Sequence, residues 1–167
     1  AAYVARHAAA KQKPSSLDQM HMPSPLVLGD DLLDYDHAEL QELILTLLDV
    51  RQDEAAAKLD RLRAHARAHF DREDADLRRL GGNNAVCHLD EHAAVLNSLD
   101  EVWATLSDSE TASAVRERLT KSLSLELLRW LPEHVSEMDA GLAAVRARSR
   151  FGGVPVKITR RIPVEPI

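Results

Sequence analysis

The stretch that decides the fold runs from His69 to His92 and reads HFDREDADLRRLGGNNAVCHLDEH. It contains two pairs of metal-ligand residues, His69 with Glu73 and His88 with His92, each separated by four positions. Residues four apart lie on one face of an α-helix, one turn above the other. The Gly-Gly-Asn-Asn segment between the pairs is a strong helix stop. The stretch therefore predicts two consecutive helices that direct four ligands into one bundle interior.

Three further residues extend this set: His37 upstream, and His134 and Asp139 downstream. Five imidazoles and two carboxylates suit two borderline metal ions bridged by the carboxylates. His134 and Asp139 are five residues apart, which is about 140° off on a regular helix. Both reach one site only if the helix widens locally, as a π-bulge does.

Two other kinds of metal site do not fit the pattern. Zinc proteases carry HExxH, whereas here Glu91 directly precedes His92 and is expected to point elsewhere on the helix. Ferritin-like bundles use ExxH pairs, and no Glu stands three residues before a His in this chain. An isolated HxxxH or HxxxE pair is more often structural than functional, so the interpretation depends on the ordered set as a whole.

The identity of the metal follows from the donor types. The set contains no thiolate, and imidazole-rich sites with bridging carboxylates suit iron. Zinc prefers four-coordinate sites and needs no paired bridging carboxylates. A pair of iron ions is therefore the first choice.

Hydrophobic periodicity and stop signals predict four helices, the last interrupted at Pro132; they lie at about 33–50, 53–80, 85–106 and 110–148. Aromatic residues make up only 4% of the chain, and Ala and Leu are abundant, which favours helices over sheets. Short links favour antiparallel neighbours. We therefore predict an all-α, up-down-up-down antiparallel four-helix bundle at residues 28–150, with an N-terminal arm at 1–27 and an extended C-terminal tail at 151–167.

Charge and composition exclude several classes of partner. The net charge of −6 argues against nucleic acid, because phosphate binding needs a basic face. No apolar run approaches the roughly 18 residues of a membrane span, and no signal-peptide core is visible. Cys87 is the sole cysteine, which excludes an intrachain disulfide and favours a reducing cytoplasm. The arm and tail are candidate contact surfaces for a protein partner.

The second predicted helix carries an arginine run and an extra histidine. We interpret the run as a solvated face with Asp60, Asp71 and Asp74, not as a binding patch; it comprises Arg61, Arg63, Arg67, Arg72, Arg78 and Arg79. His65, one turn before His69, is interpreted as an exposed helix histidine. The alternatives for His65 are an outer hydrogen-bond donor of the site or a proton-relay group.

The order of the set, a lone His followed by HxxxE, HxxxH and HxxxxD, resembles that of the hemerythrin family, in particular its bacterial HHE cation-binding domains. The step from His69 to His88 fits the family's usual spacing, and Leu28 to His37 looks like its entry into the first helix. The resemblance covers roughly residues 26 to 148 and implies that two non-heme irons are bound by His37, His69, Glu73, His88, His92, His134 and Asp139.

Further roles are implied by the same resemblance. The two carboxylates would bridge the irons, with an oxo or hydroxo group between them. One iron would then be held by His88, His92 and His134, and the other by His37 and His69. This second iron would keep one open position for dioxygen or another small diatomic ligand. Trp130 and Leu131 match a Trp-Leu pair that lines the family's oxygen pocket. Two departures are the long interval from His92 to His134 and the proline at 132.

Three functions compete at this stage. The leading hypothesis is a non-enzymatic protein that binds dioxygen reversibly, as a carrier, store or sensor. The alternative is a di-iron peroxidase, oxidase or nitric-oxide-processing enzyme, which would need an acid such as His65 or Glu133 near the open iron. The third is an iron or redox sensor that acts through a partner bound at the arm or tail.

Overall fold

A computed structural model describes residues 26–82 and 84–152 of the chain. These residues form an all-helical bundle without strands, which confirms the predicted all-α class. The main helices are α1 (Asp31–Leu48), α2 (Ala55–Leu80), α3 (Ala85–Ser107) and α4 (Ser113–His134). Helix α4 continues into a π-helical turn, η1 (Val135–Asp139), and then into α5 (Ala140–Arg150). Apart from their innermost two residues, the predicted arm and tail lie outside the described residues.

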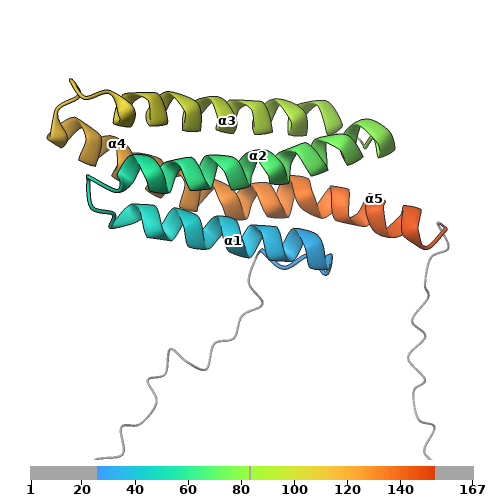
Figure 1. Cartoon of the computed structure of the whole chain (residues 1–167). Coiled ribbons are helices and arrows are strands. Elements are labelled where there is room, and N and C mark those ends of the chain that lie inside the picture. Colours follow the sequence, from blue (N-terminus) through green and yellow to red (C-terminus); the bar gives the residue numbers. More distant parts are fainter. Residues whose placement is uncertain (1–25, 83, 153–167) are drawn as a thin grey trace, which may run out of the picture.

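The helices lie side by side in the bundle (Figure 1). Helix α1 packs against α2 and α4, and α3 also packs against α2 and α4, while α5 lies against α2. Buried leucines and an isoleucine fill one half of the interior, drawn from the end of α1, the start of α2, the end of α3 and the middle of α4; they include Leu47, Leu59, Leu62, Leu106 and Leu127. The other half of the interior is polar.

The segment before α1 is closed by two aspartates. Asp30 caps the helix, because its Oδ1 accepts a hydrogen bond from Leu33 N at 3.3 Å. The Asp34 carboxylate accepts from Leu28 N at 2.6 Å and from Gly29 N at 2.9 Å. Gly29 has a φ of 80°, a left-handed conformation that favours glycine. This turn fixes the start of α1 and therefore the position of His37 in its second turn.

The long C-terminal helix differs from the prediction at one residue. Pro132 was expected to interrupt it, but α4 runs through Pro132 to His134. A proline removes one backbone hydrogen bond, here to the carbonyl of Leu128, and a packed helix can continue past that loss. The irregular turn comes next, at Val135–Asp139, where the helix is π-helical. The predicted widening between His134 and Asp139 is thus confirmed.

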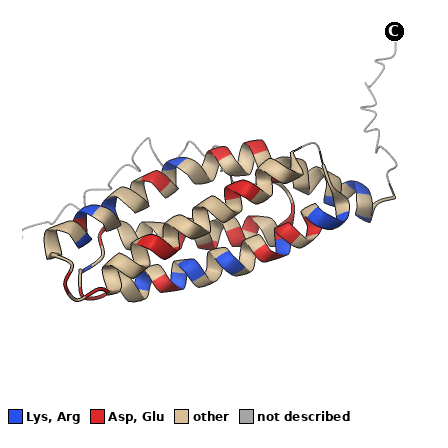
Figure 2. Cartoon of the chain, turned by 90° about the horizontal axis from the view of Figure 1, so that it is seen from above, with Lys and Arg blue, Asp and Glu red and all other residues tan. Residues whose placement is uncertain are grey.

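Charges of both signs are interleaved along the helices (Figure 2). On α2, Arg79 pairs with Asp76 at 2.7 Å and Arg78 with Asp74 at 3.4 Å. Arg63 pairs with Asp60 at 2.8 Å and also lies over the Trp103 ring, 4.3 Å from its centroid. Within the described residues, no helix is both long enough and apolar enough to cross a bilayer.

Candidate metal centre

All seven residues singled out in the sequence meet in the polar half of the bundle. Each of the four long helical segments contributes, α1 with one, α2 and α3 with two each, and α4 together with η1 with two. The side chains are almost completely buried, at 0 to 2% exposure; they are His37, His69, Glu73, His88, His92, His134 and Asp139.

Asp139 lies at the centre of one part of the cluster. Its Oδ2 is 2.9 Å from His37 Nε2, while its Oδ1 is 2.8 Å from His88 Nε2 and 3.2 Å from His134 Nε2. The two oxygens therefore face different histidines. The π-helical turn brings Asp139 to the same side of the helix as His134, as the five-residue spacing requires.

Glu73 lies at the centre of the other part of the cluster. Its Oε2 is 3.5 Å from His69 Nε2, one turn earlier on α2, and 3.3 Å from His92 Nε2 on α3. His92 Nε2 in turn lies 3.1 Å from His134 Nε2. The four side chains thus converge through their inner atoms.

These atoms form two overlapping groups with the spacing of metal sites. One group contains Glu73, His88, His92, His134 and Asp139, and the other contains His37, His69, Glu73 and Asp139; within each group the ligand atoms lie within 4.8 Å of one another. The two carboxylates belong to both groups. This division into three and two histidines agrees with the one that the family resemblance implied.

The donor atoms of the cluster fit a pair of cations. Six side-chain atoms of the site are buried without a hydrogen-bond partner: His37 Nε2, His88 Nε2 and both oxygens of Glu73 and of Asp139. The only other such atom in the described part of the chain is Gln52 Oε1. Buried polar atoms are rarely left unpaired, because each one costs about 1–3 kcal/mol. Cations at the centre would satisfy all six.

The electrostatics of the two carboxyl groups differ. Burial, followed by the nearby Asp139 carboxylate, raises the pKa of Glu73 to about 8. For Asp139 burial also favours the neutral acid, but the close imidazoles of His134, His37 and His88 outweigh it and hold its pKa far below the usual range. A chain without metal therefore keeps a proton on Glu73, which a bound cation would displace.

Carboxylates outside the cluster hold the histidine rings from behind. His69 Nδ1 lies 3.2 Å from Asp36 Oδ2, and His92 Nδ1 lies 2.7 Å from Asp74 Oδ1. His134 Nδ1 lies 3.1 Å from Glu91 Oε2. Such contacts fix the ring so that Nε2 faces the centre, and they increase its basicity.

Two further contacts complete this outer arrangement. His37 Nδ1 lies 3.3 Å from the Leu26 carbonyl oxygen. Arg72 donates a short hydrogen bond to Asp36, the carboxylate behind His69.

The sequence interpretation missed these outer carboxylates. Arg72 is exposed, as the assignment to a solvated face predicted, but it also binds Asp36. The assignment is wrong for Asp74, which is half-buried and contacts His92. Glu91 stays out of the ligand groups, as expected, but contacts the outer nitrogen of His134. A signal was present, since each outer acid directly neighbours a ligand in the sequence. Such a neighbour is rotated by about 100° around its helix and so faces the histidine of an adjacent helix.

Three residues near the cluster have other contacts. The Trp130 ring stacks on His134 with 4.4 Å between centroids, and its Nε1 donates to Glu91 Oε1 at 2.7 Å. Leu131 is buried in the apolar cluster. His65 Nε2 lies 3.2 Å from the Asp36 carbonyl oxygen and belongs to neither metal group, so it is a half-buried outer residue and not an exposed one.

Comparison with known proteins supports a cation site. Residues 28–145 match the family model described as the Hemerythrin HHE cation binding domain. Neither a search of curated proteins nor a search of solved structures found a significant match. The bundle thus contains a buried cluster of imidazoles and carboxylates that is able to bind metal.

Proposed function

Since the chain belongs to the hemerythrin family, we propose that its buried cluster holds two non-heme iron ions and binds dioxygen reversibly. The observation that carries the proposal is the division of the cluster into a three-histidine group and a two-histidine group that share both carboxylates. A pair of irons, when bound, would supply the electrons that dioxygen binding requires. Imidazole and carboxylate donors without thiolate suit iron, and Cys87 is exposed and belongs to neither group.

The two-histidine group is the candidate for the open position. His88, His92 and His134 would bind one iron, while His37 and His69 would bind the other. Glu73 and Asp139 would bridge them. With fewer protein donors, the second ion would retain room for a diatomic ligand.

The surroundings favour binding over catalysis. An enzyme acting on oxygen would need an acid directed at the open position. Of the two candidates from the sequence, His65 lies against the Asp36 carbonyl and Glu133 is exposed. Apolar side chains such as Phe70, Leu131 and Val135 are fully buried near the ligands and would exclude water. We therefore favour a carrier, store or sensor.

We also infer an up-down-up-down order for the helices. The ligands lie near the start of α1, the end of α2, the start of α3 and the end of α4. Four such positions meet at one place when consecutive helices alternate in direction. Short connections, at 49–54, 81–84 and 108–112, support this order. The exposed, single Cys87 is consistent with our proposal of a reducing, cytoplasmic setting.

Optical spectroscopy with metal analysis tests the proposed function. The purified full chain should contain two irons, and its visible charge-transfer bands should change on addition of oxygen and return on its removal. One zinc per folded chain would contradict the iron assignment. If the chain instead consumed oxygen and a reductant over many turnovers, and the bands decayed in each, the enzyme alternative would be favoured.

A further inference from the structure

The five histidines differ in what lies behind their rings. His37, His69, His92 and His134 each have a protein oxygen at Nδ1. His88 is the exception: its Nε2 faces Asp139, and among the described residues no hydrogen bond to its Nδ1 is found. His88 as a whole is buried, with 2% exposure. Its Nδ1, however, is not one of the buried side-chain atoms that lack a hydrogen-bond partner.

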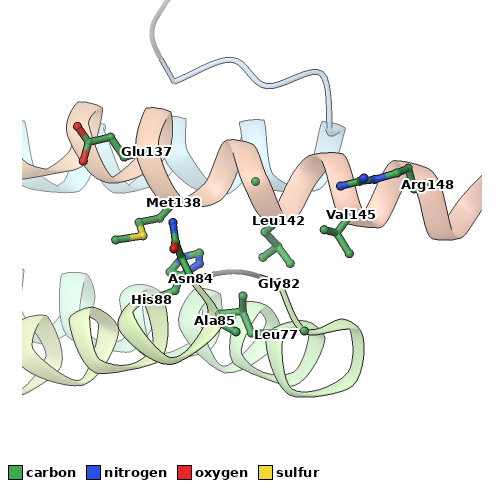
Figure 3. A pocket seen from close by; sticks show the side chains of 12 residues that line it. Leu77, Gly82, Asn84, Ala85, His88, Glu137, Met138, Leu142, Val145 and Arg148 are labelled. Carbon is green, nitrogen blue, oxygen red and sulfur yellow. The ribbon is translucent and has the colours of Figure 1, made fainter. Parts of the chain in front are cut away.

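A surface pocket explains this exception. A cavity of about 390 Å³ lies between the α2–α3 connection and the η1–α5 segment, and His88 contributes to its wall. Figure 3 shows His88 and Asn84 at one end of the pocket, with Leu142 and Val145 along one side and Arg148 at the far end. The outer nitrogen of His88 therefore faces this pocket.

The pocket offers an anion a cation, Arg148, and the start of a helix. Helix α3 starts at the pocket, since Asn84 and Ala85 line it, so the positive end of the helix dipole lies there. No side chain caps this first turn. Arg148 has no ion pair with a described carboxylate. The one acidic residue of the wall, Glu137, points its carboxylate away from the pocket in Figure 3. The remaining wall is largely apolar, with Leu77, Leu142 and Val145.

We propose that this pocket binds a small organic carboxylate, whose oxygens accept the Nδ1 hydrogen of His88 and whose hydrocarbon part packs against Leu142 and Val145. The bound carboxylate would accept the hydrogen bond from His88 Nδ1, a role that protein oxygens have for the other four histidines. The proposal rests on the proposed metal site in one respect: coordination through Nε2 leaves the hydrogen on Nδ1. An acceptor there strengthens the histidine as a ligand, so carboxylate binding tightens the hold on the three-histidine metal.

The pocket can be filled by a single substitution. A Cβ added at Gly141, which lies in the pocket wall, would meet no atom within 4 Å, and its backbone has an ordinary helical conformation. Gly141→Leu occupies the cavity, while Gly141→Ala adds one methyl group and serves as the matched control. Arg148→Gln removes the cation at the rim, and Arg118→Gln makes the same charge change at an exposed position on α4 outside the pocket lining.

Calorimetric titration of the metal-loaded full chain with butyrate provides the direct test, with 1-butanol as the neutral analogue. Butyrate and not butanol should bind, and Gly141→Leu should abolish binding while Gly141→Ala retains it. Arg148→Gln should weaken binding about two- to fivefold, the range of a single exposed charge pair, and Arg118→Gln should not. Equal responses to butyrate and butanol, or unchanged binding by Gly141→Leu, would overturn the proposal.

Metal release separates the pocket from the metal site. Butyrate should slow transfer of metal to a chelator by up to about tenfold in the unaltered chain and not in Gly141→Leu. The same titration on zinc-loaded chain, in which zinc at Nε2 leaves the His88 hydrogen on Nδ1 as iron would, should show amide chemical-shift changes at residues 84–88 and 138–148. A zinc-loaded chain that binds butyrate but takes up no iron would contradict the proposed function alone. One that binds two metals and ignores butyrate would contradict the pocket alone.

Discussion

At the scale of single residues, the site is a cluster of imidazoles held from both sides. The inner nitrogens face Glu73 and Asp139, and carboxylates such as Asp74 hold the outer ones. An acid that contacts an outer nitrogen sets the orientation and basicity of the ring without touching the metal. Residues outside the ligand set therefore control how tightly the metal is held.

Asp74→Asn should weaken metal binding by about 10–100-fold, because His92 loses its charged acceptor. The matched control is Asp76→Asn on the same helix, since its partners among the described residues are Arg79 and Arg146, and neither is a ligand. Competition with a chelator of known affinity measures the effect. Equal losses in the two variants would show that general surface charge is responsible.

Leu131→Ala should speed the loss of the oxygenated form while both irons remain bound. Shortening this buried side chain opens the apolar wall and admits water to the site. The cavity should also cost about 2–5 kcal/mol of stability. Leu127→Ala, one turn earlier in the same apolar cluster, controls for that cost. Stopped-flow decay of the oxygenated chain provides the measurement, and equal decay in both variants would mean that Leu131 does not guard the site.

At the scale of elements, the turn η1 (Val135–Asp139) is the decisive irregularity. A π-helical turn accommodates one residue more than an α-helical turn, so it aligns residues five apart. Downstream of it, α5 continues and presents Leu142 to the interior. The turn thus brings both ligands to one face without breaking the long helix.

Deletion of the exposed Ser136 should convert this turn into regular α-helix and place the former Asp139 four residues after His134. We expect the variant to fold and to retain two metals. Deletion of Ser122, in the regular part of α4, should rotate the following ligands by about 100° and abolish metal binding. Circular dichroism and metal analysis distinguish the cases. A folded Ser136 deletion without metal would show that the π geometry itself is required.

The same element shows how far sequence reasoning reached. Spacing along one helix predicted the ligand pairs and the widened turn, because helix periodicity is a local property. The outer acids could be suspected from their places next to ligands, but which histidine each acid contacts, and the environment of His88, depend on neighbouring helices. Pro132 misled the prediction for a related reason: its local cost was clear, whereas the packing that keeps the helix intact is tertiary.

At the scale of the whole molecule, the bundle has an apolar half and a half with a buried ionisable cluster. Without cations, burial and the nearby Asp139 keep Glu73 protonated up to about pH 8 in the folded chain. In the unfolded chain this carboxyl has its ordinary pKa of 4.5. For His37 and His134, burial lowers the pKa, but Asp139 outweighs it, so the pKa of each is raised.

The metal-free chain should therefore lose stability as the pH rises from about 6.5 to 8.5, because the folded state binds more protons than the unfolded state in this window. The loss should be on the order of 1–2 kcal/mol. Burial lowers the pKa of His69 and of His92, and these two shifts change the stability mainly below about pH 6.5. Urea unfolding at several pH values measures the trend.

The metal-loaded chain provides the control for this pH dependence. Its ligands are already deprotonated, so its stability should not fall over the same range, and metal affinity should rise with pH. A metal-free chain that became more stable between about pH 6.5 and 8.5 would contradict the assignment of the proton to Glu73.

The distribution of the ligands over the helices also has a consequence for the newly made protein. Synthesis proceeds from the N-terminus, so His37 emerges early and Asp139 only after the four preceding helices, α1 to α4, have been made. Neither ligand group can close before then, since Asp139 belongs to both. Metal capture is thus reserved for chains whose last helix has docked, and a ribosome-stalled or prematurely ended chain that lacks η1 remains unloaded and open to proteolysis.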